Sequence, residues 1–325
     1  MGSTHRIRYL HNTTGRTMNK IENYKRMLVG LDLTEMDEHV VRYACQVAHA
    51  FKIEAIYFFH VTSTLELPDD VIEKYGDVVA PVDETLEKEM EETVGKCFQP
   101  IEGLSMEIEA HAGQVTEEIL KWAKVKRVDL IVLGRKNVLS GSGLNSKKVA
   151  KASSCSVLFV PEKPTDKLES ILVPVDYSKY AEMAFNLAIS IQKSTGAKIL
   201  SNHVYKVPKG YYKSGKSYEE FAEIMLENTK KECKKFFRQF DLDGVDFENT
   251  FALDDDIHPA DKIYITAKEK DVDLIILGSK GRSGATALLI GSVAEKLVME
   301  DSDIPLFLVK KGNENVSLLE ALFRL

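Results

Sequence analysis

Residues 274–284 read Leu-Ile-Ile-Leu-Gly-Ser-Lys-Gly-Arg-Ser-Gly, and residues 291–294, which start ten positions after Gly281, read Gly-Ser-Val-Ala. An apolar run that stops at a glycine is typical of a buried parallel strand that opens into a loop. Glycines at 278, 281 and 291 would let the backbone approach a ligand where a Cβ would collide. Ser292 stands where a helix N-cap is expected, so free N–H groups and the positive helix end would face an anion. The stretch predicts a phosphate-binding loop of a nucleotide site, though not a Walker loop.

The chain contains this unit twice. Three segments of the first half, each apolar and ending in Asp, Gly or Val, match three segments of the second half. The separation is 144 residues between Asp32 and Asp176 and between Gly134 and Gly278, and 149 residues between Val160 and Val309. The two copies therefore keep one register up to the glycine and differ by five residues in the loop that follows.

Each copy alternates apolar strands with amphipathic helices, which predicts an α/β fold with a parallel sheet covered on both faces. In the second copy we expect strands near 170–175, 198–204, 246–252, 273–277 and 305–309. We expect helices near 179–194, 217–240, 259–270 and 292–300. The predicted organisation is a basic leader (1–21), a first domain (22–162), a linker (163–168), a second domain (169–311) and a tail helix (312–325).

Composition narrows the class of protein. The net charge of −7 argues against a nucleic-acid surface, and no apolar run approaches the roughly 18 residues that a membrane span requires. The four scattered cysteines form no metal-like spacing and are expected to be small hydrophobes in a reducing cytoplasm. Residues 1–20 are basic without an apolar core, so an upstream start or a disordered arm is favoured over a transit peptide. The tail has a capping box at Ser317 and one apolar side, which packs on its own chain or meets a partner.

The spacing Gly278-x2-Gly281-x9-Gly291-Ser292, together with the strand that ends at Asp176, resembles the universal stress protein family. Residues 22–311 fit two such domains in tandem. The resemblance implies two doubly wound parallel five-stranded sheets of strand order 3-2-1-4-5, Rossmann-like and adenine nucleotide α-hydrolase-like. It also implies ATP, with Mg²⁺ or Mn²⁺, near the adenosine-side residues Asp176 and Val204 and the loop glycines. The implied ATP-binding residues are Pro174, Val175, Asp176, Val204, Leu277, Gly278, Lys280, Gly281, Arg282, Gly291, Ser292 and Val293.

Local alternatives remain for several of these residues. Asp176 is either a ligand contact or a turn residue before Ser178. Lys280 and Arg282 either neutralise phosphate or are solvated loop cations. His60 and His203, at matching strand ends, are expected to be structural rather than catalytic.

The first copy departs from the family pattern. Asn137 stands where the second glycine belongs, and Gly143-Leu144 follows after five intervening residues, without the serine. Gly30 replaces Pro174, whereas Asp32 is retained. We therefore expect the first domain to bind nucleotide poorly or not at all and to act as a pseudo-symmetric partner. In this family the last strands pair across a dimer, so residues 157–160 and 306–309 would meet within one chain; a homodimer is a further option.

Residues 210–217 match the literal P-loop pattern GxxxxGK[ST]. The match follows the second strand of the copy at a distance, and the first copy has an acidic segment there, so a mobile lysine-rich loop is favoured. Asp254, Asp255 and Asp256 either bind a divalent ion or form a solvated turn, and the turn is favoured. We expect no dedicated metal site and no catalytic residue.

The sequence thus favours a cytoplasmic stress-response protein that couples ATP binding in the second domain to an unidentified protein partner. Slow hydrolysis is the most that is expected, because no general base can be named. The alternatives are a nucleotide hydrolase or adenylyl transferase on the same fold, a nucleotide-free scaffold, and a P-loop protein.

Overall fold

A computed structural model of the chain describes residues 24–66, 81–135, 143–165, 167–281, 290–299 and 302–311. These residues fall into two compact units. The amino-terminal unit contains residues 23–164 and the residues from Asp301 onward, and the carboxyl-terminal unit contains Thr165–Glu300. The predicted leader and tail helix, Asn137 and Arg282 lie outside the described residues.

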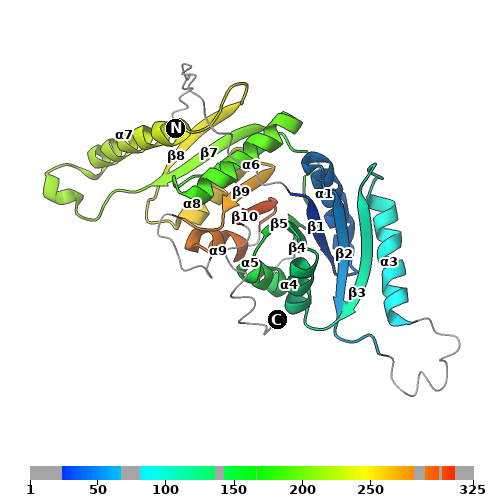
Figure 1. Cartoon of the computed structure of the whole chain (residues 1–325). Coiled ribbons are helices and arrows are strands. Elements are labelled where there is room, and N and C mark those ends of the chain that lie inside the picture. Colours follow the sequence, from blue (N-terminus) through cyan, green and yellow to red (C-terminus); the bar gives the residue numbers. More distant parts are fainter. Residues whose placement is uncertain are drawn as a thin grey trace. The chain divides into compact units, whose positions relative to one another are not determined.

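The amino-terminal unit is a sheet of order β3-β2-β1-β4-β5 with parallel neighbours, as predicted, and β10 is added antiparallel beside β5. Helices α1 and α3 lie on one side of this sheet and α4 and α5 on the other (Figure 1). Its strands are β1 (Arg26–Leu31), β2 (Ala55–Thr62), β3 (Ser105–Ala112), β4 (Leu130–Arg135), β5 (Ser156–Pro161) and β10 (Leu306–Val309). Its helices are α1 (Met36–Phe51), α3 (Val82–Cys97), α4 (Val115–Val125) and α5 (Gly143–Ala152).

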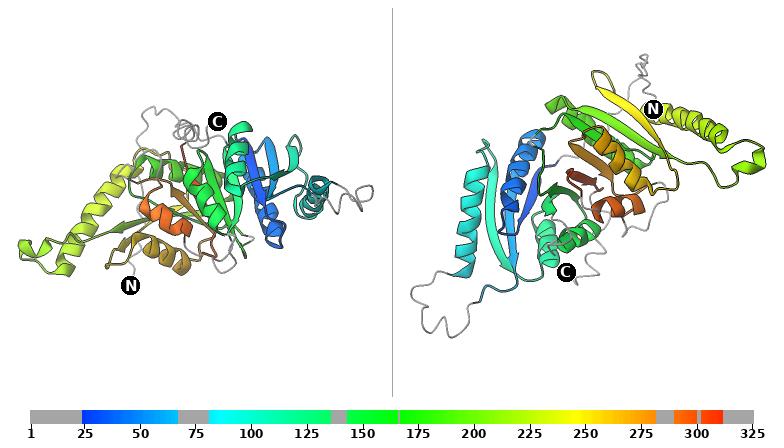
Figure 2. Two further views of the ribbon diagram at one scale, coloured as in Figure 1. Left: turned by 90° about the horizontal axis from the view of Figure 1, so that it is seen from below. Right: turned by 180° about the vertical axis from the view of Figure 1, so that it is seen from behind.

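The carboxyl-terminal unit is a parallel sheet of order β9-β6-β7-β8. Helices α6 and α7 cover one of its faces, and α8 and α9 cover the other (Figure 2). Its strands are β6 (Ser170–Pro174), β7 (Lys198–Tyr205), β8 (Phe247–Leu253) and β9 (Leu274–Gly278). Its helices are α6 (Lys179–Thr195), α7 (Tyr218–Phe237), α8 (Pro259–Glu269) and α9 (Ser292–Met299), with a short 3₁₀ turn, η2 (Tyr211–Ser214). The four predicted helices and the first four predicted strands of this copy agree with these bounds to within three residues. The fifth predicted strand, 305–309, is β10, which belongs to the amino-terminal unit.

Both units begin their sheets with the same side-chain clamp. Asp129 Oδ2 accepts hydrogen bonds from the N–H groups of Lys25 and Arg26, at 2.8 and 2.9 Å. Asp273 Oδ2 accepts equivalent bonds from Glu169 and Ser170, at the same two distances. An aspartate before the fourth strand therefore fixes the start of the first strand in each repeat.

The strand β10 pairs with β5 and so covers an edge of β5 that would otherwise be open. Leu306 pairs with Phe159 and Leu308 with Val157, and both strands are buried throughout. This is the pairing of the last strands that the family resemblance implies. Two buried cations anchor the segment around β10: Lys310 Nζ donates to Ser153 O at 2.7 Å, and Arg135 donates to the carbonyls of Ser302 and Ile304 at 2.9 and 2.8 Å.

Candidate functional site

The candidate site lies at the carboxyl ends of β6 and β9, which are paired neighbours. Pro174 ends β6 and Val175 follows it; both are buried, and the Val175 N–H donates to the Asn202 carbonyl at 2.8 Å. Buried Leu277 leads into Gly278 at the end of β9. Ligands of open α/β sheets sit outside strand ends of this kind. The chain segments that follow Asp176 and Gly278 therefore leave the sheet at one edge.

Asp176 and Gly281 lie in direct contact. A Cβ placed on Gly281 would stand 2.7 Å from Asp176 Oδ2. The other carboxylate oxygen, Oδ1, accepts the N–H of Ser178 at 3.0 Å, and Ser178 in turn caps α6 by accepting the Ala181 N–H. Asp176 is thus a turn residue through one oxygen, while the second oxygen faces the glycine loop.

Gly291 returns the loop to the same point. Its N–H donates to Ser279 O at 2.8 Å, and a Cβ on it would lie 3.5 Å from the Gly281 nitrogen. The Gly291 carbonyl accepts the Glu295 N–H at 2.8 Å, so Gly291 is in the N-cap position and α9 begins with Ser292. The expectation that Ser292 is the N-cap is therefore wrong by one residue, because the first helical bond ends on the glycine.

Contacts within the chain explain why glycine is required at two of the three positions, but not at the third. A Cβ at Gly278 would stand 2.7 Å from the Tyr180 backbone carbon, and one at Gly281 would meet the Asp176 carboxylate. Both glycines are accounted for by contacts within the chain, whereas the sequence interpretation gave them a ligand. Gly291 alone has only ordinary van der Waals neighbours. Among the described glycines of this loop, it is the one where an added Cβ would meet no tight contact with the described residues.

The other predicted ATP-binding residues differ in their burial and in their position relative to this turn. Lys280 is half-buried, with Nζ 5.6 Å from the centroid of the Tyr180 ring. Ser292 is exposed and Val293 half-buried in the first turn of α9. Val204, also half-buried, lies on β7 two residues beyond Asn202, which pairs with Pro174. Arg282 lies outside the described residues, so its position stays a prediction.

The turn contains an aromatic pair that the sequence pattern did not single out. Tyr177 follows Asp176 with φ of 66°, and its ring stacks on His203 with centroids 4.5 Å apart. His203 Nδ1 lies 2.6 Å from the Val175 carbonyl, so this nitrogen carries the proton. His60 Nδ1 makes the same contact with Leu31 O at 3.0 Å in the first repeat. Both histidines thus hold the carbonyl at a strand end, which is a structural role.

The P-loop-like segment does not form a phosphate loop in this structure. Its middle is the 3₁₀ turn η2, and β7 ends at Tyr205, well before Gly210. Ser217 caps α7: its hydroxyl accepts the Glu220 N–H at 3.2 Å, and its own N–H donates to the Glu220 carboxylate at 2.9 Å. The capping box thus engages the Ser217 hydroxyl, which in a P-loop would coordinate Mg²⁺.

The corresponding turn of the first repeat is tied internally. The carboxylate of buried Asp37 accepts the N–H groups of Asp32 and Leu33, at 3.0 and 2.7 Å. Burial raises the pKa of Asp37 to about 6, against these two hydrogen bonds. Arg135, which stands where the second repeat has Ser279, is buried and donates to the segment before β10. The side chains of this strand end are thus committed to the unit's own structure.

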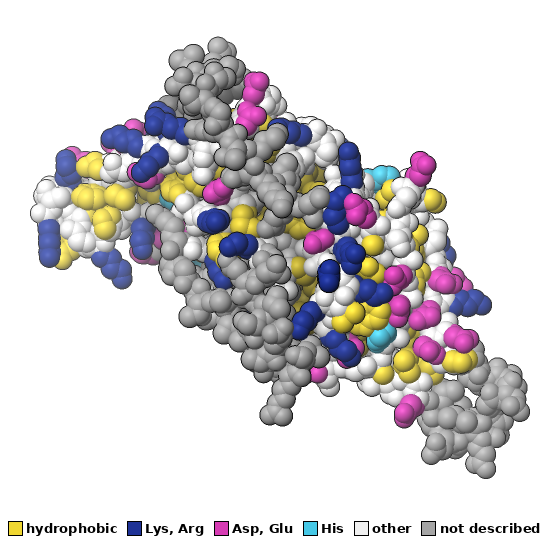
Figure 3. All heavy atoms as spheres, viewed as in Figure 1, with side chains coloured by type: hydrophobic (Ala, Val, Ile, Leu, Met, Phe, Trp, Pro, Cys, Tyr) yellow, Lys and Arg dark blue, Asp and Glu magenta, His cyan; other side chains and the backbone are white. Residues whose placement is uncertain are grey.

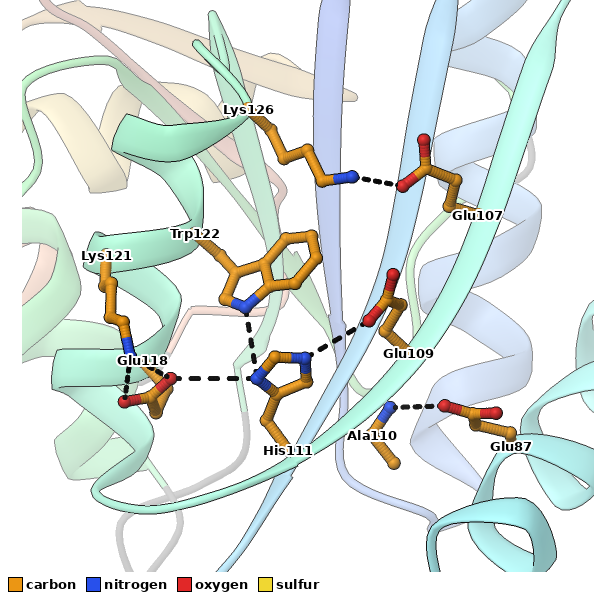
Figure 4. A network of polar contacts seen from close by, with 9 residues as sticks. All are labelled: Glu87, Glu107, Glu109, Ala110, His111, Glu118, Lys121, Trp122 and Lys126. Carbon is orange, nitrogen blue, oxygen red and sulfur yellow. Dashed lines mark hydrogen bonds and ion pairs between the residues drawn. The ribbon is translucent and has the colours of Figure 1, made fainter.

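A cluster of aromatic and charged side chains lies in the same unit, between α4 and the strands β2 and β3 (Figure 4). The ring centroid of Phe59 is 5.0 Å from that of His111 and 5.2 Å from that of Trp122. Trp122 Nε1 donates to His111 Nδ1 at 3.1 Å, and His111 Nε2 lies 3.2 Å from Glu109 Oε2. Phe59 pairs with Gly30 as Asn202 pairs with Pro174, so the first repeat has an aromatic ring where the second has a small amide.

The remaining candidates are structural where they are described. Asp255 pairs with Lys262 at 3.0 Å, and His258 caps α8 by accepting the Ala260 N–H. Among the described residues there is no group of three or more side chains suited to a metal ion, and all four cysteines are free thiols. Burial raises the pKa of Cys155 and of Cys233 to about 12, as expected of cysteines that act as small hydrophobes. Within the described chain, no helix has the length and apolarity of a membrane span.

Two repeats of a parallel α/β sheet, one with a glycine loop at its strand ends, define a tandem α/β protein. The model of the universal stress protein family matches residues 23–161 and again residues 167–310. The chain belongs to the universal stress protein family, as a tandem two-domain member.

Individual relatives agree with this assignment. Universal stress protein MJ0531 of Methanocaldococcus jannaschii is 32% identical over 145 residues, which are 44% of this chain and 82% of that protein. A solved universal stress protein from Archaeoglobus fulgidus superimposes with a TM-score of 0.55 at 19% identity, covering 90% of this chain and 98% of that one. The functionally unknown protein PA1789 from Pseudomonas aeruginosa gives 0.60 at 16% identity, covering 94% and 99%. At these identities the two structures show the shared fold.

Proposed function

We propose that the carboxyl-terminal unit binds ATP and that the protein is a nucleotide-dependent stress-response module of the cytoplasm. The observation that carries this proposal is the convergence of Asp176, Gly281 and Gly291 at the ends of two paired strands. The carboxylate is suited to accept hydrogen bonds from the nucleoside, and the start of α9 is suited to the phosphates. Lys280 supplies a cation beside the loop, and Mg²⁺ or Mn²⁺ would be bound mainly through the phosphates.

The amino-terminal unit is proposed to bind nucleotide weakly or not at all. Asp37 already occupies the amides of its strand-end turn, and Arg135 is held by backbone carbonyls.

Signalling would follow if ATP orders the loop after β9 and so changes the surface that a protein partner meets. Hydrolysis would be slow, because no described side chain at the site is placed as a general base. Acidic side chains are frequent over α3 and β3 at the right of Figure 3, which disfavours a polyanionic partner.

Calorimetric titration of the full chain with ATP and Mg²⁺ tests the proposal. We expect one site per chain, and Gly291→Val should weaken binding at least about tenfold, since its side chain would enter the space of the ligand. The variant is suited to the test because a Cβ at this position meets no tight contact with the described residues.

Lys216→Ala is the matched control and should bind as the unmodified chain does. Loss of binding in this control with retention in Gly291→Val would instead indicate a P-loop. No heat and no change in melting temperature at millimolar ATP would indicate a nucleotide-free scaffold. Rapid turnover that is lost in Gly281→Val would indicate an enzyme.

A further inference from the structure

The turn that carries Asp176 is conformationally strained. Tyr177 has φ of 66°, a region that costs a bulky side chain free energy and that glycine would enter freely. Among the described residues it is the one aromatic residue with such a φ. Conformations of this kind persist only where the surrounding contacts hold them.

The contacts that hold Tyr177 come from β7 and α7. Its ring lies 4.5 Å from the His203 ring at an interplanar angle of 14°, and 5.5 Å from the Phe236 ring. Its hydroxyl donates to the Thr229 carbonyl at 3.4 Å. His203 also holds the Val175 carbonyl, so one histidine contacts the residues on both sides of Asp176.

The first repeat holds the same left-handed turn by other means. Leu33 has φ of 56°, and the Asp37 carboxylate accepts the N–H groups of Asp32 and Leu33. In the second repeat Ala181 stands where Asp37 would be, and it has no carboxylate to offer. In the second repeat the aromatic stack on Tyr177 therefore stands where the first repeat uses this clamp.

We propose that Tyr177 is a positioning residue of the nucleotide site: by stacking on His203 it directs the Asp176 carboxylate toward Gly281. The inference rests on the proposed function for its consequence on affinity. Tyr177 acts through Asp176, so its effect on binding should disappear when the carboxylate is removed.

A double-mutant cycle by calorimetry tests this in the full chain with ATP and Mg²⁺. Tyr177→Leu, which introduces the residue of the first repeat, should raise Kd roughly tenfold. Tyr177→Phe keeps the ring and should stay within about twofold, because the lost hydrogen bond is long. In an Asp176→Asn background, Tyr177→Leu should have little further effect. An equal loss in both backgrounds, or no loss at all, would overturn the proposal.

Hydrogen exchange of the Ser178 amide gives a readout that needs no ligand. This N–H donates to Asp176 Oδ1, so Tyr177→Leu should speed its exchange about tenfold while the buried amides of β9 exchange as before. Unchanged Ser178 exchange, or equal acceleration in β9, would overturn the positioning role. If the unmodified chain binds no nucleotide, the proposed function fails, while the exchange experiment still decides the role of Tyr177.

Discussion

Asp37 and Ala181 occupy equivalent positions in the two repeats, and only Asp37 has a carboxylate that can bind the turn after the first strand. The carboxylate of Asp37 is buried and satisfied by two backbone N–H groups, so the turn of the first repeat carries its own anion. Ala181 offers no carboxylate at this position, and in the second turn Asp176 Oδ1 accepts the Ser178 N–H instead. The Asp37 carboxylate, which accepts two turn N–H groups, thus distinguishes the turn of the first repeat from that of the second.

The same carboxylate predicts a pH dependence of stability. Its pKa is raised from 3.8 to about 6, mainly by burial, with the nearby Asp32 carboxylate acting in the same direction. Between these values the folded state holds a proton that the unfolded state has lost. The contribution of Asp37 to stability is therefore full below about pH 4 and is lost as pH rises through about 6, by up to roughly 3 kcal/mol.

Urea unfolding followed by tryptophan fluorescence measures this effect, because Trp122 is the chain's single tryptophan and lies in the amino-terminal unit. The stability difference between the unmodified chain and Asp37→Asn should shift in favour of the variant as pH rises from 4.5 to 7.5. A shift in the opposite direction would mean that the two hydrogen bonds outweigh burial.

At the scale of elements, the segment 210–217 matches a P-loop pattern but ends in the capping box of α7, so we assign it a structural role. Ser217→Ala should lower the stability of the carboxyl-terminal unit by about 1 kcal/mol, since it removes the cap on the Glu220 N–H. The affinity for ATP should be unchanged, as measured by calorimetry beside denaturant unfolding. Weaker binding with undiminished stability would contradict the assignment of this segment as a helix cap.

Most helices and strands could be predicted from the sequence. The pairing of the last strands, β5 and β10, could be predicted from the family resemblance. The apolar runs that end at Asp176 and Gly278 locate two strands. The alternation of strands and helices predicts the α/β class, and the strand order is what the resemblance to the universal stress protein family implies. The site was less accessible, because reasons such as the Tyr180 backbone beside Gly278 or the His203 ring beneath Tyr177 exist only in three dimensions. The role of Arg135 was equally hidden, since its partners lie 167 and 169 residues away.

At the scale of the whole molecule, β10 makes the amino-terminal unit depend on the end of the chain. Removal of the residues from Asp301 onward would open the buried edge of β5, and open apolar edges promote association. This truncated chain should self-associate in sedimentation velocity experiments. A chain that ends at Lys311 keeps β10 and should behave as the full chain does; a monomeric, equally stable chain without β10 would contradict the role given to this strand.

The dependence on β10 also decides how the nucleotide proposal is best tested, because halves of the chain would separate β10 from β5. A crystal structure of the full chain grown with ATP and Mg²⁺ tests the central claim most directly. We predict nucleotide density in the second repeat, with the phosphates at Gly281, Gly291 and the start of α9 and the nucleoside beside Asp176, and none at Asp32. An empty loop in the second repeat, or a nucleotide bound in the first, would contradict it.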